Sequence, residues 1–145
     1  MIAGLDTNIL CYTLDKAYPE NKILGSLLLN LSEESKLALN PTVLHETYHT
    51  LVFGQKWSSE EAAVRLDALL RHPFIDFFNQ TKKTSHIALN LSVRHALGGR
   101  DALIVASYIV NKIPVIYTHD KELLKIQKIT WKNTNLTFKD LLSES

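Results

Sequence analysis

The chain has 145 residues, of which 46% are apolar and 21% are charged, and its formal net charge is +1. This balance is typical of a globular fold with one core, so we expect a single domain over residues 1–145. No apolar run approaches the roughly 20 residues that cross a bilayer, and Asp6 interrupts the first apolar segment. We therefore expect no membrane span, no signal peptide and a cytoplasmic location, and the single Cys11 suits a reducing compartment.

The charges are unevenly distributed along the chain. Residues 82–132 carry nine Lys or Arg and three acidic residues, whereas residues 1–81 carry six basic and ten acidic residues. One face could therefore attract phosphate groups, and a solvated surface without a partner is the alternative.

The first half of the chain predicts strands that alternate with helices. Apolar runs predict the strands, and apolar residues at helical spacing with polar caps predict the helices. In chain order, the predicted elements are a strand over residues 2–5 that leads into a turn and helix at Asp6-Thr7-Asn8, a helix over 19–31, a strand over 36–40, a helix from Asn40 or Thr42 to about Phe53, a helix from Ser58 to about Leu70 and a strand over 74–78.

The second half continues the alternation. Gly98-Gly99 is expected to end one helix, and Pro114 the next. In chain order, the predicted elements are a helix over 85–96, a helix over 100–110, a strand over 115–117, a short helix over 121–126, a short fifth strand near 129–131 and a last helix that is capped by Thr137 or Asp140 and ends at Leu142.

This alternation predicts an α/β fold. Parallel neighbours need crossover connections, and helices of this length supply them. We expect a three-layer α/β/α sandwich around a central, mostly parallel sheet of four to five strands.

Four acidic residues fall where predicted strands end or helices begin. Asp6 ends the first strand, and Glu46 lies about one turn into the helix after the second. Asp101 lies in the first turn of its helix, and Asp120 follows the strand over 115–117. In open α/β sheets, ligands bind outside the carboxyl ends of the strands, so we expect these four carboxylates near one edge of the sheet.

Four carboxylates in one place need a cation. At about 4 Å and an effective dielectric constant near 20, each pair repels by roughly 4 kcal/mol. Oxygen ligands suit a hard cation, so Mg²⁺ or Mn²⁺ is the expected cofactor. Singly, each acid has an ordinary alternative: Asp6 as a helix cap, Glu46 on a solvated face, Asp101 at a helix dipole and Asp120 in a turn.

Four segments of the sequence resemble the motifs of a known family. They are Leu5-Asp6-Thr7-Asn8-Ile9-Leu10, Val43-Leu44-His45-Glu46, Arg100-Asp101-Ala102-Leu103-Ile104-Val105-Ala106 and Tyr117-Thr118-His119-Asp120-Lys121-Glu122-Leu123. In this order and at this spacing they resemble the PIN domains, especially the small ribonuclease toxins of VapBC-type toxin-antitoxin pairs. The resemblance covers nearly the whole chain, although each motif alone is weak.

The resemblance implies a Mg²⁺- or Mn²⁺-dependent endoribonuclease, in which a metal-activated water hydrolyses RNA. It also implies a small antitoxin partner and a homodimer. The implied catalytic residues and metal ligands are Asp6, Glu46, Asp101 and Asp120, and the residues implied to orient ligands or waters are Thr7, Asn8 and Thr118.

Side chains around these motifs have further candidate roles. Two-metal chemistry needs no histidine, so we assign no catalytic role to His45, His49 or His119 and leave Glu122 peripheral. Trp57 and Trp131 could stack on RNA bases or on a partner helix, but we favour core packing or a plain exposed edge. The candidate phosphate contacts are Arg100, Lys121, Lys82 and Lys83.

Two other functions fit the same residues. One is a housekeeping RNA-processing nuclease or a DNA nuclease with the same site. The other is a PIN-like RNA-binding module without turnover, against which four intact acidic residues argue. A neighbouring reading frame for a DNA-binding antitoxin would favour the toxin.

Overall fold

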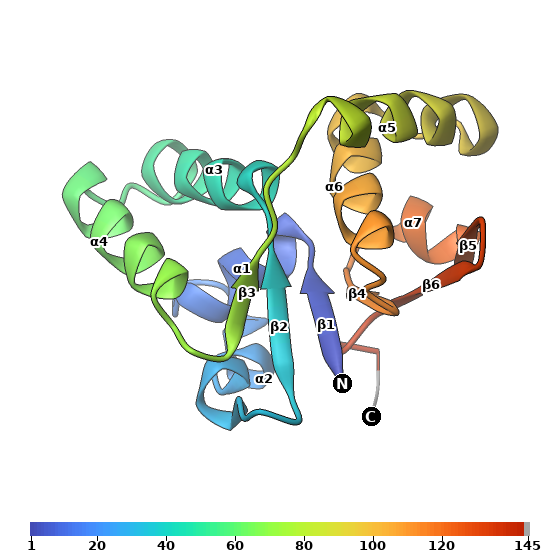
Figure 1. Cartoon of the computed structure of the whole chain (residues 1–145). Helices are drawn as coiled ribbons and strands as arrows, with labels where there is room; N and C mark the ends of the chain where they lie inside the picture. Colours follow the sequence, from blue (N-terminus) through green and yellow to red (C-terminus); the bar gives the residue numbers. More distant parts are fainter. Residues whose placement is uncertain (144–145) are drawn as a thin grey trace.

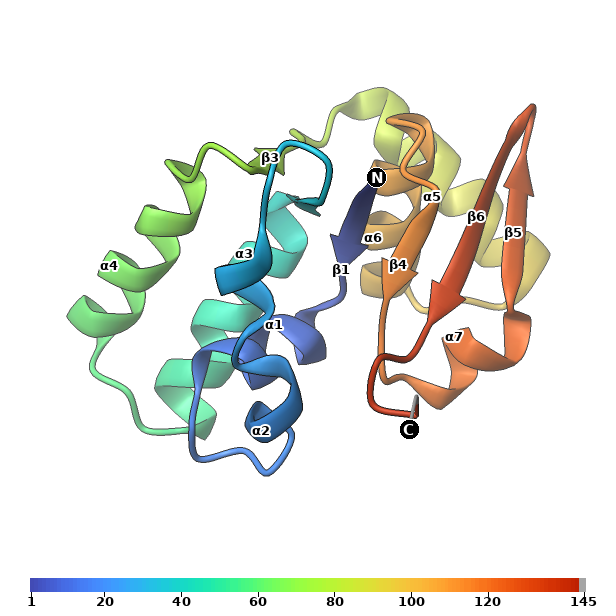
Figure 2. The ribbon, with the colours of Figure 1, turned by 90° about the horizontal axis from the view of Figure 1, so that it is seen from below.

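The computed structural model describes residues 1–143, and this part of the chain forms a six-stranded sheet with helices on both faces (Figures 1 and 2). The strands are β1 (Ile2–Leu5), β2 (Lys36–Leu39), β3 (Ile75–Phe77), β4 (Val115–Tyr117), β5 (Lys128–Trp131) and β6 (Thr134–Lys139). Their order in the sheet is β3-β2-β1-β4-β6-β5. All neighbours are parallel except β5 and β6.

Helices cover the sheet on both sides. In Figure 2, α5 and α6 lie on one side of the sheet, and α1, α2 and α7 lie on the other. In residues 1–143, no helix combines the length and the apolar character needed to cross a membrane. The helices are α1 (Thr7–Leu14), α2 (Asn21–Leu24), the 3₁₀ helix η1 (Leu27–Asn30), α3 (Pro41–His49), the π-helix η2 (Thr50–Gly54), α4 (Ser59–Leu70), α5 (Lys82–His95), α6 (Gly99–Val110) and α7 (Lys121–Ile126).

The predicted α/β fold with a mostly parallel sheet is confirmed. The order of the strands places a crevice between β1 and β4. From β1, the chain adds β2 and β3 on one side of β1 in the sheet, and it then returns to place β4 on the other side of β1. Leu5 pairs with Tyr117 at the carboxyl ends of β1 and β4, and the amide of Asp6 donates to the carbonyl of Tyr117 at 3.0 Å. Such a switch in direction is where α/β sheets bind ligands.

Tyr108 ties α6 to the two central strands. Its ring is fully buried, and its hydroxyl lies 2.7 Å from the carbonyl oxygen of Leu5 and 3.0 Å from that of Ala38. A Cβ atom on Gly4 of β1 would lie 2.7 Å from this ring, so the close approach requires glycine. The packing therefore fixes α6, which carries Asp101, against the strand that leads to Asp6.

The sheet has six strands rather than four to five, and the predicted last helix is wrong. Thr137 lies inside β6, Asp140 follows this strand, and Leu142 lies in a turn. Leu136 and Phe138 are buried while Thr137 between them is exposed, and this period of two is that of a strand. The segment pairs with β5 as a hairpin instead of starting a helix.

Other boundaries also differ from the prediction. The helix expected over 19–31 is split into α2 and η1 around Gly25-Ser26, which are poor helix formers. The helix expected to reach Phe53 ends as an α-helix at His49, and the next residues form the π-helix η2. Ala96, with φ 56°, ends α5, whereas Gly98 caps the start of α6.

We predict that Gly4→Ala destabilises the fold by about 1–3 kcal/mol, because the new methyl group would overlap the buried ring of Tyr108. Urea unfolding should show a lower midpoint with an unchanged slope. Gly99→Ala is the control, because nothing lies within 4 Å of a Cβ atom added there. An unchanged midpoint for Gly4→Ala would contradict the packing argument.

Candidate active site

A pocket of about 680 Å³ opens at the carboxyl ends of β1 and β4, and the four predicted acidic residues all line it. Each comes from a different element. Asp6 caps α1, Glu46 lies on α3, Asp101 lies in the first turn of α6, and Asp120 caps α7. Thr7, Asn8 and Arg100 also line the pocket.

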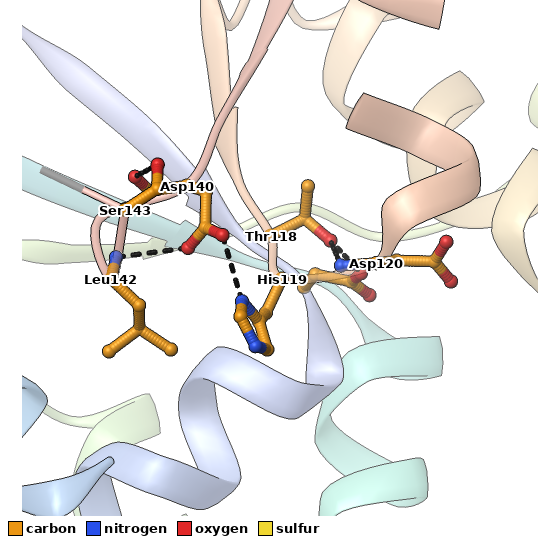
Figure 3. A network of polar contacts seen from close by, with 7 residues as sticks. Thr118, His119, Asp120, Asp140, Leu142 and Ser143 are labelled. Carbon is orange, nitrogen blue, oxygen red and sulfur yellow. Dashed lines mark hydrogen bonds and ion pairs between the residues drawn. The ribbon is translucent and has the colours of Figure 1, made fainter. Parts of the chain in front are cut away.

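Asp6 is buried and both of its carboxylate oxygens accept hydrogen bonds. The amide of Thr7 donates to Oδ1 at 2.8 Å, and the hydroxyl of Thr118 donates to Oδ2 at 2.7 Å. The same hydroxyl oxygen accepts from the amide of Asp120 at 3.0 Å, a contact drawn in Figure 3. Thr118 therefore links the carboxylate that follows β1 to the segment that follows β4.

Glu46 is held from two sides. The hydroxyl of Thr7 donates to its Oε1 at 2.6 Å, and Nε of Arg100 lies 3.1 Å from its Oε2. The Arg100 side chain is 81% exposed and that of Glu46 is 21% exposed. An ion pair with such an exposed partner contributes little to stability, so it can open at low cost.

Asp120 and Asp101 differ in their surroundings. Oδ1 of Asp120 accepts from the amides of Glu122 at 2.8 Å and Leu123 at 3.3 Å, which fixes this side chain at the start of α7. The pKa of Asp101 is raised by burial and by the charges of Asp120 and Glu46, and the charge of Arg100 opposes this rise. The charges of Asp120 and Glu46 are therefore close enough to disfavour ionisation of Asp101.

The pKa of Asp6 is raised more than that of Asp101. Burial, with a smaller contribution from the charges of Asp101 and Asp120, raises the pKa of its carboxyl group to about 6, against the hydrogen bonds from Thr118 and Thr7. The folded chain thus holds a carboxylate whose charge is poorly compensated. A cation in the pocket would relieve this.

The donor atoms fit a hard divalent cation. Carboxylate oxygens predominate, and Oδ1 of Asn8 is a buried acceptor without a hydrogen-bond partner among residues 1–143. The carboxylates surround the pocket rather than converge: in this part of the chain no three Asp, Glu, His or Cys side chains already form a set that could hold an ion. A cation that binds Glu46 would compete with the guanidinium group of Arg100 for its carboxylate.

Several other candidate residues lie elsewhere. The residues that line the pocket include His45 and His49 but not Lys121, Lys82, Lys83 or His119. The remaining predicted side chains have structural contacts: the indole N–H of Trp57 donates to Asp15 at 3.1 Å, Trp131 lies under Arg94, Glu122 pairs with Lys125 at 3.6 Å, and Nδ1 of His119 lies 2.8 Å from Oδ2 of Asp140 (Figure 3).

Two tyrosines that line the pocket, Tyr12 and Tyr18, were not predicted from the sequence. Tyr12 lies four residues after Asn8 in α1, so helical spacing places both on one face. That signal was present in the sequence. Tyr18 lies in the segment between α1 and α2, where no periodicity could have indicated its position.

We predict that Asp6 makes the metal-free protein less stable as the pH rises. The carboxyl group loses its proton near pH 3.8 in the unfolded chain but near pH 6 in the folded chain. Stability should therefore fall through this window, by about 3 kcal/mol, and stay level above it. Asp6→Asn keeps a capping side chain but cannot ionise. In EDTA, the free energy of unfolding of Asp6→Asn should therefore increase relative to that of the wild type as the pH rises through the same window.

Urea unfolding at several pH values between about 4 and 7 measures this difference. Asp67→Asn, an exposed acid paired with Arg71 at 3.0 Å on α4, is the control. A difference between Asp6→Asn and the wild type that stays constant with pH would contradict the raised pKa.

Comparisons with known proteins support the fold. No curated protein is similar enough in sequence to count as a relative. The Mycobacterium tuberculosis toxin VapC20, described as cleaving the sarcin-ricin loop, is similar in structure with a TM-score of 0.69 and 19% identity, over 83% of this chain and 91% of that chain. VapBC2 from Rickettsia felis, bound to a DNA fragment from its promoter, gives a TM-score of 0.67 and 21% identity, over 97% of this chain and all (100%) of that chain.

VapBC-1 from nontypeable Haemophilus influenzae gives a TM-score of 0.62 and 20% identity, over 99% of this chain and 100% of that chain. At these identities the likeness concerns the fold. The sequence itself is matched over residues 4–129 by the PIN domain. This match spans most of the chain, and we conclude that the protein belongs to the PIN-domain family.

Proposed function

We propose that this chain, as one domain over residues 1–145, is a Mg²⁺- or Mn²⁺-dependent endoribonuclease and the toxin of a toxin-antitoxin pair. PIN domains are typically metal-dependent nucleases. The observation that carries the proposal is the pocket beside β1 and β4, which is lined by four acidic side chains from four elements. The likeness to a toxin described as cleaving the sarcin-ricin loop supports RNA as the substrate.

The four carboxylates would hold the metal, with Glu46 joining once Arg100 leaves it. A bound divalent cation supplies Lewis acidity and lowers the pKa of a water molecule to near neutrality. The chain's own hydroxyl groups hold the ligands: Thr118 orients Asp6, and Thr7 orients Glu46. Asn8 would complete this set through its buried side-chain oxygen.

Arg100 is the best candidate for contact with the RNA phosphate. It is the only Lys or Arg among the pocket-lining residues of the described chain. When its guanidinium group leaves Glu46, it can donate charge-assisted hydrogen bonds to phosphate oxygens. Lys121 is exposed at the first position of α7 and would act only on a longer stretch of RNA.

A small antitoxin and a homodimer belong to the same proposal. The similar structures include a toxin-antitoxin complex from Klebsiella pneumoniae and, separately, FitAB bound to a DNA fragment. Those complexes support a partner of the antitoxin kind for this chain.

We predict that Asp6→Asn and Asp101→Asn each lower Mg²⁺-dependent RNA cleavage by at least roughly 100-fold, because each removes a charged metal ligand. Gel-based cleavage of labelled RNA, with circular dichroism to confirm folding, measures this. Asp67→Asn should cleave like the wild type. Undiminished cleavage by either pocket variant would rule out the proposed site.

We also predict that expression of the wild-type chain arrests bacterial growth, that Asp6→Asn does not, and that co-expression of an antitoxin from a neighbouring reading frame restores growth. Colony counts after induction measure the effect. Normal growth together with RNA cleavage in vitro would instead favour a housekeeping nuclease. RNA binding without cleavage would favour a binding module.

A further inference from the structure

The pocket extends beyond the acidic side chains along two helices. Thr7 at the start of α1 is joined to Glu46 of α3 by the 2.6 Å hydrogen bond. At a rise of about 1.5 Å per residue, Tyr12 lies about 7.5 Å further along α1, and His49 lies about 4.5 Å further along α3. Both line the pocket, as do Tyr18 and His45. One part of the cavity is therefore bounded by aromatic rings from two elements.

The rings on the α1 side are held in place by their neighbours. Tyr12 packs edge to face on Tyr18, with ring centres 5.0 Å apart and an interplanar angle of 75°. On its other side it packs on His119, with centres 6.2 Å apart and an angle of 73°. His119 is anchored in turn by Asp140, as Figure 3 shows. These contacts fix the rings before any ligand arrives.

The α3 side also presents aromatic rings. His49 packs on Phe53 with ring centres 4.9 Å apart, and Phe53 is 64% exposed. Phe53 lies in the π-helix η2, and π-helical turns occur frequently at functional sites. An exposed phenylalanine that touches a pocket-lining ring widens the aromatic surface next to the cavity.

This part of the pocket suits an uncharged ring rather than a phosphate group. Arg100, the only Lys or Arg among the lining residues of the described chain, is paired with Glu46. Burial raises the pKa of Tyr12 and raises that of Tyr18 to about 12, so both hydroxyl groups stay neutral. A second phosphate would find no further Lys or Arg among the lining residues of the described chain. A planar base would find rings to stack on and hydroxyl groups to bond.

We propose that the cavity between Tyr12, Tyr18 and His49 binds one unpaired nucleobase next to the phosphodiester that is cleaved. The inference rests on the proposed function and specifies its substrate as RNA with a nucleotide splayed out of its stack. The pocket volume of about 680 Å³ lies within the roughly 300–1,000 Å³ of small-ligand sites, so it holds more than a cation. Aromatic stacking of this kind contributes about 1–3 kcal/mol per base.

Binding of labelled RNA octamers in EDTA tests the inference without cleavage. Fluorescence anisotropy compares octamers of A, C, G or U with an abasic octamer that has the same phosphates, so repulsion by the acidic residues affects all of them equally. The wild type should bind the base-bearing octamers about ten-fold more tightly than the abasic one.

Variants locate this preference in the pocket. Tyr12→Ala and Tyr18→Ala should each lower affinity for the base-bearing octamers by about ten-fold and leave the abasic octamer unchanged, whereas Tyr12→Phe should retain nearly all of it. His49→Ala, at an exposed position where folding is not at risk, should also weaken base binding. Tyr48→Ala is the matched control, because Tyr48 lies on α3 but lines a different pocket.

Equal wild-type affinity for base-bearing and abasic octamers would overturn the inference, and so would losses in Tyr12→Ala and His49→Ala that do not depend on the base. RNA cleavage by the wild type in Mg²⁺ is measured separately. Cleavage without a base preference leaves the proposed function standing and removes the subsite. A Tyr12-dependent base preference without cleavage in Mg²⁺ or Mn²⁺ supports the subsite and overturns the nuclease.

Discussion

The site depends on one carboxyl group that is buried beside other carboxylates. Asp6 lies at the end of the central strand β1, where the sheet changes direction, and its burial, together with the nearby charges of Asp101 and Asp120, disfavours its ionisation. The threonine contacts to Asp6 and Glu46 keep the carboxylates in place despite that repulsion. The fold thus maintains an arrangement that a cation in the pocket would make more favourable.

The same pocket combines two kinds of surface. Its acidic part comes from the starts of α1, α6 and α7 and from Glu46 within α3, and its aromatic part comes from positions further along α1 and α3 and from the segment after α1. A hard cation and a phosphate match the first surface, whereas a neutral ring matches the second. Chemistry and recognition would therefore be arranged along one cavity, and the hydrogen bond between Thr7 and Glu46 joins them.

Much of the fold could be predicted from the sequence, because buried strands and capped helices leave local patterns. The strand β6 was missed because Thr137 and Asp140 resemble helix caps, although Leu136 and Phe138 alternate with exposed residues. The positions of the four acids at element ends could also be read locally. The pairing of Arg100 with Glu46 could not, because it depends on how α6 and α3 pack across the sheet edge. The catalytic roles of the four acidic residues and of Arg100 stay predictions.

The order of the elements along the chain has a consequence for biosynthesis. The acidic side chains of the pocket are spread from Asp6 to Asp120, and the strand β4 that aligns Asp120 is flanked by β1, which precedes it in the sequence, and by β6, which follows it. A nascent or truncated polypeptide that stops before β4 carries three of these carboxylates but lacks the partner strand beside β1. A complete pocket can therefore form only after the segment that carries β4 and Asp120 has been synthesised.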